Sequence, residues 1–212
     1  MSANHAAFNL IFRFVENYIS PIAGRISSQR HVMAIRDGFI SAMPFMIVGS
    51  FLLVFAYPPF SPDTTWGFAR AWLDLAKEFE GRILTPFDMT MGIMSIYICA
   101  AISYNLGKHY EKSNQLDPFM CAMLSIMAFL LIAAPKTNGT LPVDSLGGTG
   151  IFTAILVAIY CVEMMRFLKA HNIGIRLPDQ VPPMIKNSFD LLIPVLVVVL
   201  TLYPLSLFIQ HH

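Results

Sequence analysis

Acidic side chains inside apolar segments are the first candidates for a functional site. A carboxylate at lipid depth is energetically costly, so it usually pairs with another group or carries protons. Three such residues are Asp88, Glu163 and Asp190. Each lies near one end of its apolar segment. Arg166 follows Glu163 by three residues, which is helical spacing. Lys186 precedes Asp190 by four. The pattern favours locally paired residues at the membrane interface over a proton relay, which needs a deeper carboxylate.

The remaining reactive residues predict no catalytic, substrate-binding or metal site and no cofactor. The three cysteines, Cys99, Cys121 and Cys161, fall in apolar segments without a CxxC pair, so we expect them to act as small packing residues. The histidines are expected in loops or at termini: His5, His31, His109, His171, His211 and His212. No two of them have metal-ligand spacing on one helix. Without a nucleophile–base pair either, an enzyme is not expected.

The elements that would position these residues are long apolar segments. Hydrophobic residues make up 56% of the 212-residue chain and charged residues 13%, against about a quarter charged in soluble domains. Five segments approach the roughly 20 residues needed to cross a bilayer. They are 38–57, 85–107, 118–134, 150–170 and 188–209. The predicted fold class is therefore all-α, a polytopic membrane bundle of about five transmembrane helices.

The basic residues predict an orientation. Ten of the 14 lysines and arginines fall on one side of the five segments. They are Arg13, Arg25, Arg30, Arg36, Lys108, Lys112, Arg166, Lys169, Arg176 and Lys186. The other side holds Arg70, Lys77, Arg82 and Lys136. The positive-inside rule then places the N-terminus in the cytoplasm and the C-terminus outside the inner membrane. A net charge of +1 without a basic run argues against a nucleic-acid partner.

Two further stretches have the periodicity of amphipathic helices. Apolar residues recur at three- and four-residue steps over 5–29, which predicts a helix along the cytoplasmic interface. A helix packed on its own bundle would give the same pattern. A second apolar stripe runs over 69–83. Trp66 and Trp72 beside it are the only tryptophans and are expected at headgroup depth.

The second predicted span carries small residues at every fourth position. They are Ser95, Cys99, Ser103 and Gly107. Small side chains at this spacing let helix backbones approach closely inside lipid. We therefore expect this span in the middle of the bundle or at a subunit contact.

Three segments resemble the enzyme IIC family of lactose, cellobiose and chitobiose phosphotransferase systems. The first is HVMAIRDGFISAMPFMIVGSFLLVF at 31–55, a basic approach leading into a span. The second is TMGIMSIYICAAISYNLG at 90–107. The third and most specific is IRLPDQVPPMIKNSFDLLIPVL at 175–196, which is similar to the family's cytoplasmic entry into the fifth span. Order and spacing agree from about residue 5 to residue 205.

The resemblance implies a fold, partners and an activity. Family members have ten spans and work as homodimers, and their first five spans form the dimerisation scaffold. The second half holds the sugar site and moves like an elevator. Cytoplasmic EIIA and EIIB components then supply the phosphate, from a phosphocysteine on EIIB. Residues 1–212 would thus be the N-terminal scaffold part of an EIIC domain, with disaccharide bound only if the second half is supplied.

The chain departs from the family pattern where it stops at His212, so no family sugar-binding residue is carried over to it. Three interpretations follow. The chain is a sugar permease component completed by a second polypeptide, a truncated remnant that inserts without transporting, or a membrane scaffold that dimerises with a full-length permease. The sequence does not choose the sugar, and the nearly all apolar or small residues at lipid depth offer no cluster of hydrogen-bonding groups for one.

Overall fold

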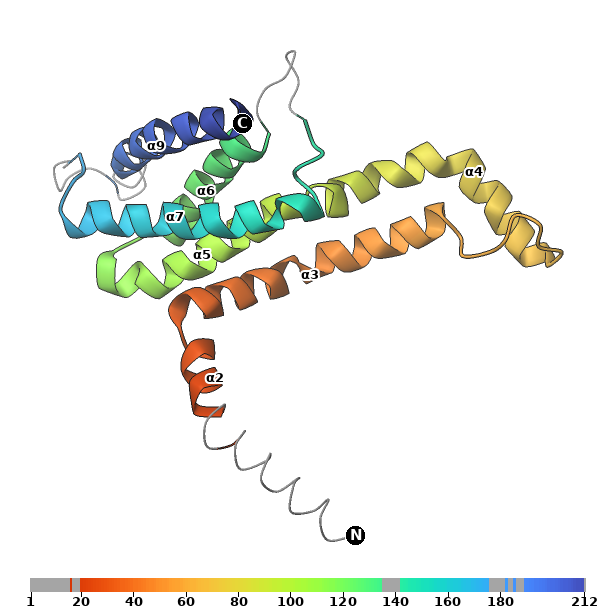
Figure 1. Ribbon diagram of the computed structural model, residues 1–212, viewed down its shortest axis with the longest axis horizontal. Helices are drawn as coiled ribbons and strands as arrows, with labels where there is room; N and C mark the ends of the chain where they lie inside the picture. Colours follow the sequence, from red (N-terminus) through yellow and green to blue (C-terminus); the bar gives the residue numbers. More distant parts are fainter. Residues whose placement is uncertain are drawn as a thin grey trace, which may run out of the picture.

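The computed structural model describes residues 16, 20–134, 142–175, 182, 185 and 189–211, and every regular element in this part is helical (Figure 1). The α-helices are α2 (Ser20–Ser27), α3 (Arg30–Ala56), α4 (Gly67–Phe87), α5 (Met94–Asn114), α6 (Pro118–Ala133), α7 (Ile151–Ala170) and α9 (Leu192–His211). A π-helical turn, η2 (Asp88–Gly92), joins α4 to α5, and a 3₁₀ turn, η3 (Gly148–Gly150), precedes α7. The all-α prediction is confirmed.

Each of the five predicted spans overlaps an apolar helical run. Three helical runs are long and apolar enough to cross a bilayer: Arg30–Ala56, Gly67–Asn114 and Gly148–Ala170. The third and fifth predicted spans correspond to the shorter apolar helices Pro118–Ala133 and Leu192–Phe208. The described part of the chain is therefore a multi-pass arrangement of apolar helices.

Several helix ends differ from the predicted span boundaries, which concern where the chain crosses the membrane and stay predictions. The helix that contains the first predicted span begins at Arg30 rather than at 38, and the second predicted span lies within a 48-residue run from Gly67 to Asn114. Hydropathy marks where a segment turns polar, but a helix continues into the polar zone as long as its residues tolerate helical geometry. The predicted helix over 5–29 lies mostly outside the described residues, and α2 is the part of it that they contain.

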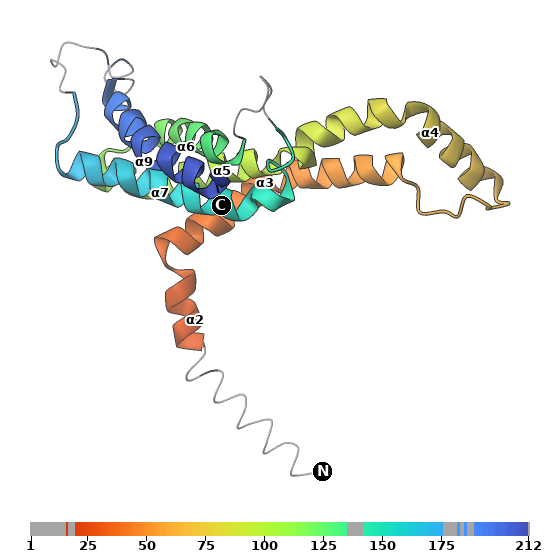
Figure 2. The ribbon, with the colours of Figure 1, turned by 45° about the horizontal axis from the view of Figure 1, so that its top comes forward.

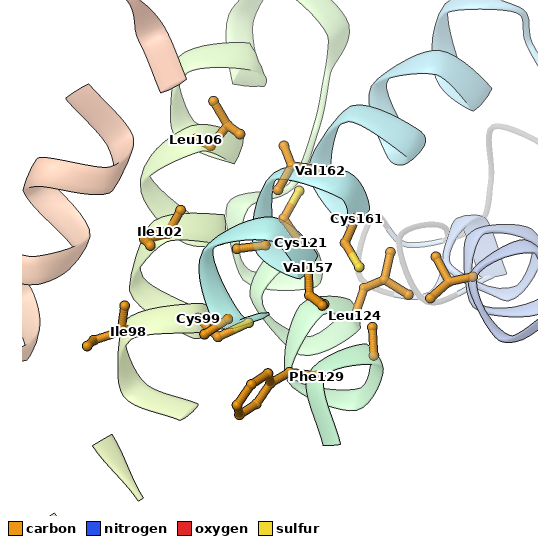
Figure 3. Close-up of a cluster of buried hydrophobic side chains, with 14 of the residues drawn as sticks. Ile98, Cys99, Ile102, Leu106, Cys121, Leu124, Phe129, Val157, Cys161 and Val162 are labelled. Atoms are coloured by element: carbon orange, nitrogen blue, oxygen red, sulfur yellow. The ribbon is translucent and has the colours of Figure 1, made fainter. Parts of the chain in front are cut away.

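Helix α5 is the centre of the bundle and packs against α3, α6 and α7. Its small residues Ser95, Cys99, Ser103 and Gly107 are all buried, as the four-residue spacing predicts for the middle of a bundle. A Cβ added to Gly107 would lie 3.0 Å from the Cys121 sulfur of α6. Figure 3 shows the surrounding core, in which Ile98 and Ile102 of α5 point toward α3, while Cys99 points toward side chains of α6 and α7.

The α5–α6 turn is encoded locally and sets the two helices side by side. Gln115 ends α5 with a left-handed φ of 53°. Two residues later, an Asp117 carboxylate oxygen accepts hydrogen bonds from the amides of Phe119 (2.9 Å) and Met120 (3.4 Å), while Pro118 occupies the first turn of α6. An aspartate cap followed by proline is a strong helix start. The chain therefore reverses within three residues.

Helix α3 has two different faces. Its small residues Ala34, Gly38, Ala42, Gly49 and Ala56 are buried. Large apolar residues lie on the opposite side at heptad-like spacing and are about half exposed; we call them the outer face of α3. They are Ile40, Met43, Ile47, Phe51 and Val54. Beyond the bundle, residues 49–87 form a two-helix arm made of the end of α3 and α4 (Figures 1 and 2).

The amphipathic pattern over 69–83 is explained by this arm. Ala69 and Ala76 of α4 are buried, and α4 packs along α3. Near the end of the arm, the Trp72 indole nitrogen donates a hydrogen bond to the Phe55 carbonyl oxygen at 3.2 Å. Trp66 is 59% exposed. That both tryptophans lie at headgroup depth stays a prediction.

The contact between α3 and α5 gives a first test. A Cβ added to Gly38 would lie 2.9 Å from the Ile102 backbone nitrogen, so Gly38→Ala must push two backbones apart. We expect a loss of about 1–3 kcal/mol in unfolding free energy, measured as a lower thermal midpoint in detergent. Gly81→Ala is the matched control, because nothing lies within 4 Å of a Cβ at that helical glycine. Equal midpoints for the two variants would contradict the close packing.

Candidate functional site, a charged cluster at one end of the bundle

The charged cluster forms where α3 begins and α5 and α7 end. Helix α3 runs opposite to α5 and α7, so the start of α3 and the ends of the other two helices meet here. Its members are Arg30 and His31 of α3, Tyr110 of α5, and Glu163 and Arg166 of α7. The apolar lengths of these helices fix how deep each group lies, and long polar side chains can reach the interface from there.

One carboxylate organises the cluster. Glu163 Oε1 accepts a hydrogen bond from the Tyr110 hydroxyl at 2.7 Å and lies 2.9 Å from His31 Nε2. Glu163 Oε2 is 2.6 Å from a guanidinium nitrogen of Arg166. The Glu163 side chain is 25% exposed, so its negative charge is partly desolvated and is compensated by these neighbours.

Two arginines flank the tyrosine of the cluster. The guanidinium carbon of Arg166 lies 4.9 Å from the centre of the Tyr110 ring, and that of Arg30 lies 5.5 Å from it. These are cation–π distances, so the ring faces attract both positive charges while the hydroxyl donates to Glu163. The cluster therefore joins the first turn of α3 to the ends of α5 and α7 and resists their separation.

The cluster confirms one sequence prediction and corrects another. The predicted Glu163–Arg166 pair is present. The placement of the histidines in loops or termini was wrong for His31 and His109, which lie within α3 and α5. His31 is 132 residues away from Glu163 in sequence, so no local pattern could pair them. The sequence did offer one indication of this contact, because both residues lie on the predicted cytoplasmic side of their spans.

The other two acidic candidates lie apart from this cluster. Asp190 Oδ2 is 3.4 Å from Lys169 Nζ, which also donates to the Gln115 carbonyl oxygen at 2.8 Å. Its predicted partner Lys186 lies outside the described residues. A cavity of about 380 Å³ borders Lys169 and Asp190. Asp88 is exposed at the start of η2. The three acidic residues therefore do not form one site.

A second, largely apolar cavity of about 760 Å³ lies between α6, α7 and α9. Leu156 and Val157 of α7 and Leu202 of α9 contribute to its wall. The Tyr160 hydroxyl beside it is 2.6 Å from the Thr201 hydroxyl, so these two polar groups pair with each other. The three cysteines, Cys99, Cys121 and Cys161, are buried in the bundle, in agreement with a packing role.

Apolar helices long enough to span a bilayer, joined at charged ends, define a multi-pass α-helical membrane protein. The family model described as "Phosphotransferase system, EIIC" matches residues 36–211. The chain belongs to this family.

Its relatives are longer than it is. The cellobiose-specific EIIC component of Geobacillus stearothermophilus is 35% identical over 206 residues, which cover 88% of this chain and 43% of that protein. The lactose-specific EIICB component of Streptococcus mutans is 33% identical over 196 residues, covering 90% of this chain and 33% of that protein. The chain thus spans less than half the length of these relatives.

A solved structure has the same fold. The transporter ChbC, the IIC component from the N,N'-diacetylchitobiose-specific phosphotransferase system, matches with a TM-score of 0.77 and 33% sequence identity. The match covers 94% of this chain and 48% of that one. The fold predicted from the resemblance is confirmed.

The charged cluster gives a second prediction. Glu163→Gln keeps the side-chain shape but removes the charge that Arg166 and His31 face. We expect a loss of about 1–3 kcal/mol in unfolding free energy, seen as a lower thermal midpoint in detergent. Glu111→Gln, at an exposed position of α5, is the control and should leave the midpoint unchanged. A midpoint that falls equally in both variants would show that Glu163 does not organise this end of the bundle.

Proposed function

We propose that this chain is the scaffold part of the membrane permease component of a phosphoenolpyruvate-dependent sugar phosphotransferase system, acting on a disaccharide of the cellobiose, lactose or chitobiose type. Membership of the EIIC family carries the proposal. The printed names of its relatives supply the class of sugar, since they are cellobiose-, lactose- and diacetylchitobiose-specific components.

The packing supports a scaffold role for these residues. Sugar hydroxyls need several convergent hydrogen-bonding groups in a pocket. The cavity between α6, α7 and α9 is mainly apolar, and the centre of the bundle is filled by side chains of α5, α6 and α7. We propose that the sugar binds to a second half such as the longer relatives have, and that residues 1–212 hold that half in the membrane.

We also propose the orientation and the soluble partners. The charged cluster collects Arg30, His31 and Arg166 at one end, which the positive-inside rule assigns to the cytoplasm. That end would then face EIIA and EIIB. Some relatives are EIICB proteins, in which the two components form one chain. The opposite end, with the start of α7, would face the outside of the inner membrane.

A homodimer is the proposed assembly, with the outer face of α3 as its contact. Phe51 and Ile40 are 63% and 55% exposed. The heptad-like spacing of this face is the one that helices use to pack against each other over several turns. The arm extends past the bundle, so a neighbouring copy would give it the packing partner that α5 to α9 do not provide (Figure 2).

Transport is tested with a chimera. The segment of the Geobacillus stearothermophilus cellobiose relative that matches this chain is replaced by this chain, in cells without their own cellobiose permease. We expect phosphoenolpyruvate-dependent cellobiose uptake by the chimera and none by residues 1–212 alone. The unmodified relative is the positive control.

Two results would contradict the transport proposal. Uptake by residues 1–212 alone would place the sugar site within them. A chimera that reaches the membrane at the level of the relative but takes up no sugar would favour the alternative, a scaffold or remnant that only inserts and dimerises.

The dimer contact is tested by oxidative cross-linking in membranes. We expect Ile47→Cys on the outer face of α3 to form a disulfide-linked dimer, because equivalent positions of one helix meet across a twofold axis. Leu200→Cys, 65% exposed on α9, is the control and should stay monomeric. The native cysteines are buried and should not compete. Equal cross-linking at both positions, or none at Ile47, would contradict this interface.

A further inference from the structure

The junction between the arm and the bundle contains a break in the helical run from α4 to α5. Pro86 lies in the last turn of α4, and η2 follows with π-helical geometry over Asp88–Gly92. Ile93 then departs from helical backbone angles, with φ −119° and ψ 23°. Prolines and π-helical turns are the recognised causes of kinks in long helices, and mid-helix π turns are frequent at functional sites. The 48-residue run is therefore two helices with a break between them.

The neighbouring helix, α3, carries a proline near this break. Pro44 lies inside α3, and the ring of the next residue, Phe45, stacks on Tyr97 of α5 with ring centres 4.4 Å apart. Farther along α3, a Cβ added to Gly49 would lie 2.5 Å from Met91 Cγ in η2. The two segments that connect the arm to the bundle, one in α3 and one between α4 and α5, thus each carry a proline, which weakens a helix.

On the arm side of the break, side-chain hydroxyls form hydrogen bonds with backbone carbonyl oxygens. The Tyr97 hydroxyl donates to the Met89 carbonyl oxygen at 2.7 Å. Thr90 Oγ1 lies within hydrogen-bond distance of the Pro86 carbonyl oxygen (2.9 Å) and the Phe87 carbonyl oxygen (3.0 Å). Backbone polar groups at membrane depth need partners, and hydroxyls of this kind let a broken helix keep them.

The bundle side of the break is fixed in a different way. The Ser95 amide donates to the Leu146 carbonyl oxygen at 2.9 Å, and the Ser95 hydroxyl donates to the carbonyl oxygen of Gly147. Ser95 is fully buried. The first turn of α5 is therefore tied to the turn that leads into α7, whereas the arm side depends on hydroxyls, which can rotate.

We propose that residues 86–93 together with Pro44 form a hinge about which the arm changes its angle to the bundle. The hydrogen bond from the Tyr97 hydroxyl to the Met89 carbonyl oxygen sets this angle. The hinge does not rest on the proposed transport function. Its moving part is the arm outside the hinge, residues 49–85, and its fixed part is α5, α6, α7 and α9. Hinge motions of packed helices of this kind are absorbed by a few residues at element ends.

Electron-spin distance measurements test the hinge. Spin labels at Asp74→Cys on α4 and Lys108→Cys on α5 lie on the two sides of the break, at exposed positions. Labelled protein is diluted with unlabelled protein so that distances within one chain dominate. We expect Tyr97→Phe to widen this distance distribution about twofold, because the hydrogen bond to the Met89 carbonyl oxygen is lost. Tyr104→Phe, which removes a hydroxyl from an exposed position of the same helix, should leave it unchanged.

A second label pair separates hinge motion from loss of fold. Labels at Lys108→Cys and Phe152→Cys both lie on the bundle and should keep a narrow distribution in every variant. Thr90→Val, which removes the other hydroxyl of the break, should widen the arm distance as Tyr97→Phe does. Widening of both pairs, or an unchanged arm distance in both Tyr97→Phe and Thr90→Val, would overturn the hinge.

Discussion

The close approach of α5 to its neighbours is the constraint on which the rest of the structure depends. Helices in lipid gain little from burying apolar surface, because the lipid tails are as apolar as they are, so close backbone contact has to hold them together. Gly38 on α3 and Gly107 on α5 provide that contact against Ile102 and Cys121. With small residues on these faces, α5 packs in the middle, and α3, α6 and α7 surround it.

The packing brings the polar ends of the helices together and so produces the charged cluster. Glu163 would be a costly isolated charge at the end of α7, but the parallel helix α5 supplies Tyr110 and the antiparallel helix α3 supplies His31. The two faces of α3 determine which apolar residues are exposed. Because α3 uses its small residues inward, its large apolar residues remain on the outer face, where we propose a second copy.

The sequence predicted the features that depend on local pattern. The five apolar segments, the central position of the second and the Glu163–Arg166 pair followed from hydropathy, four-residue spacing and an i, i+3 pair. It could not predict the His31–Glu163 contact, because that contact depends on how α3 and α7 both pack against α5. The break at 88–92 was also missed, since the apolar pattern continues through η2 while hydroxyls of Thr90 and Tyr97 replace part of the helical hydrogen bonding. Side-chain satisfaction of backbone groups has no signature in hydropathy.

The central claim is that the helices cross the membrane in alternating directions, with the charged cluster on the cytoplasmic side. Labelling of intact cells with a membrane-impermeant maleimide tests it most directly. Each variant carries one introduced, exposed cysteine, either Lys112→Cys in the last turn of α5 or Val143→Cys before α7. The account predicts that Val143→Cys reacts at once and that Lys112→Cys reacts only after the membrane is permeabilised. Reaction of both positions from the same side, or of Lys112→Cys alone in intact cells, would contradict it.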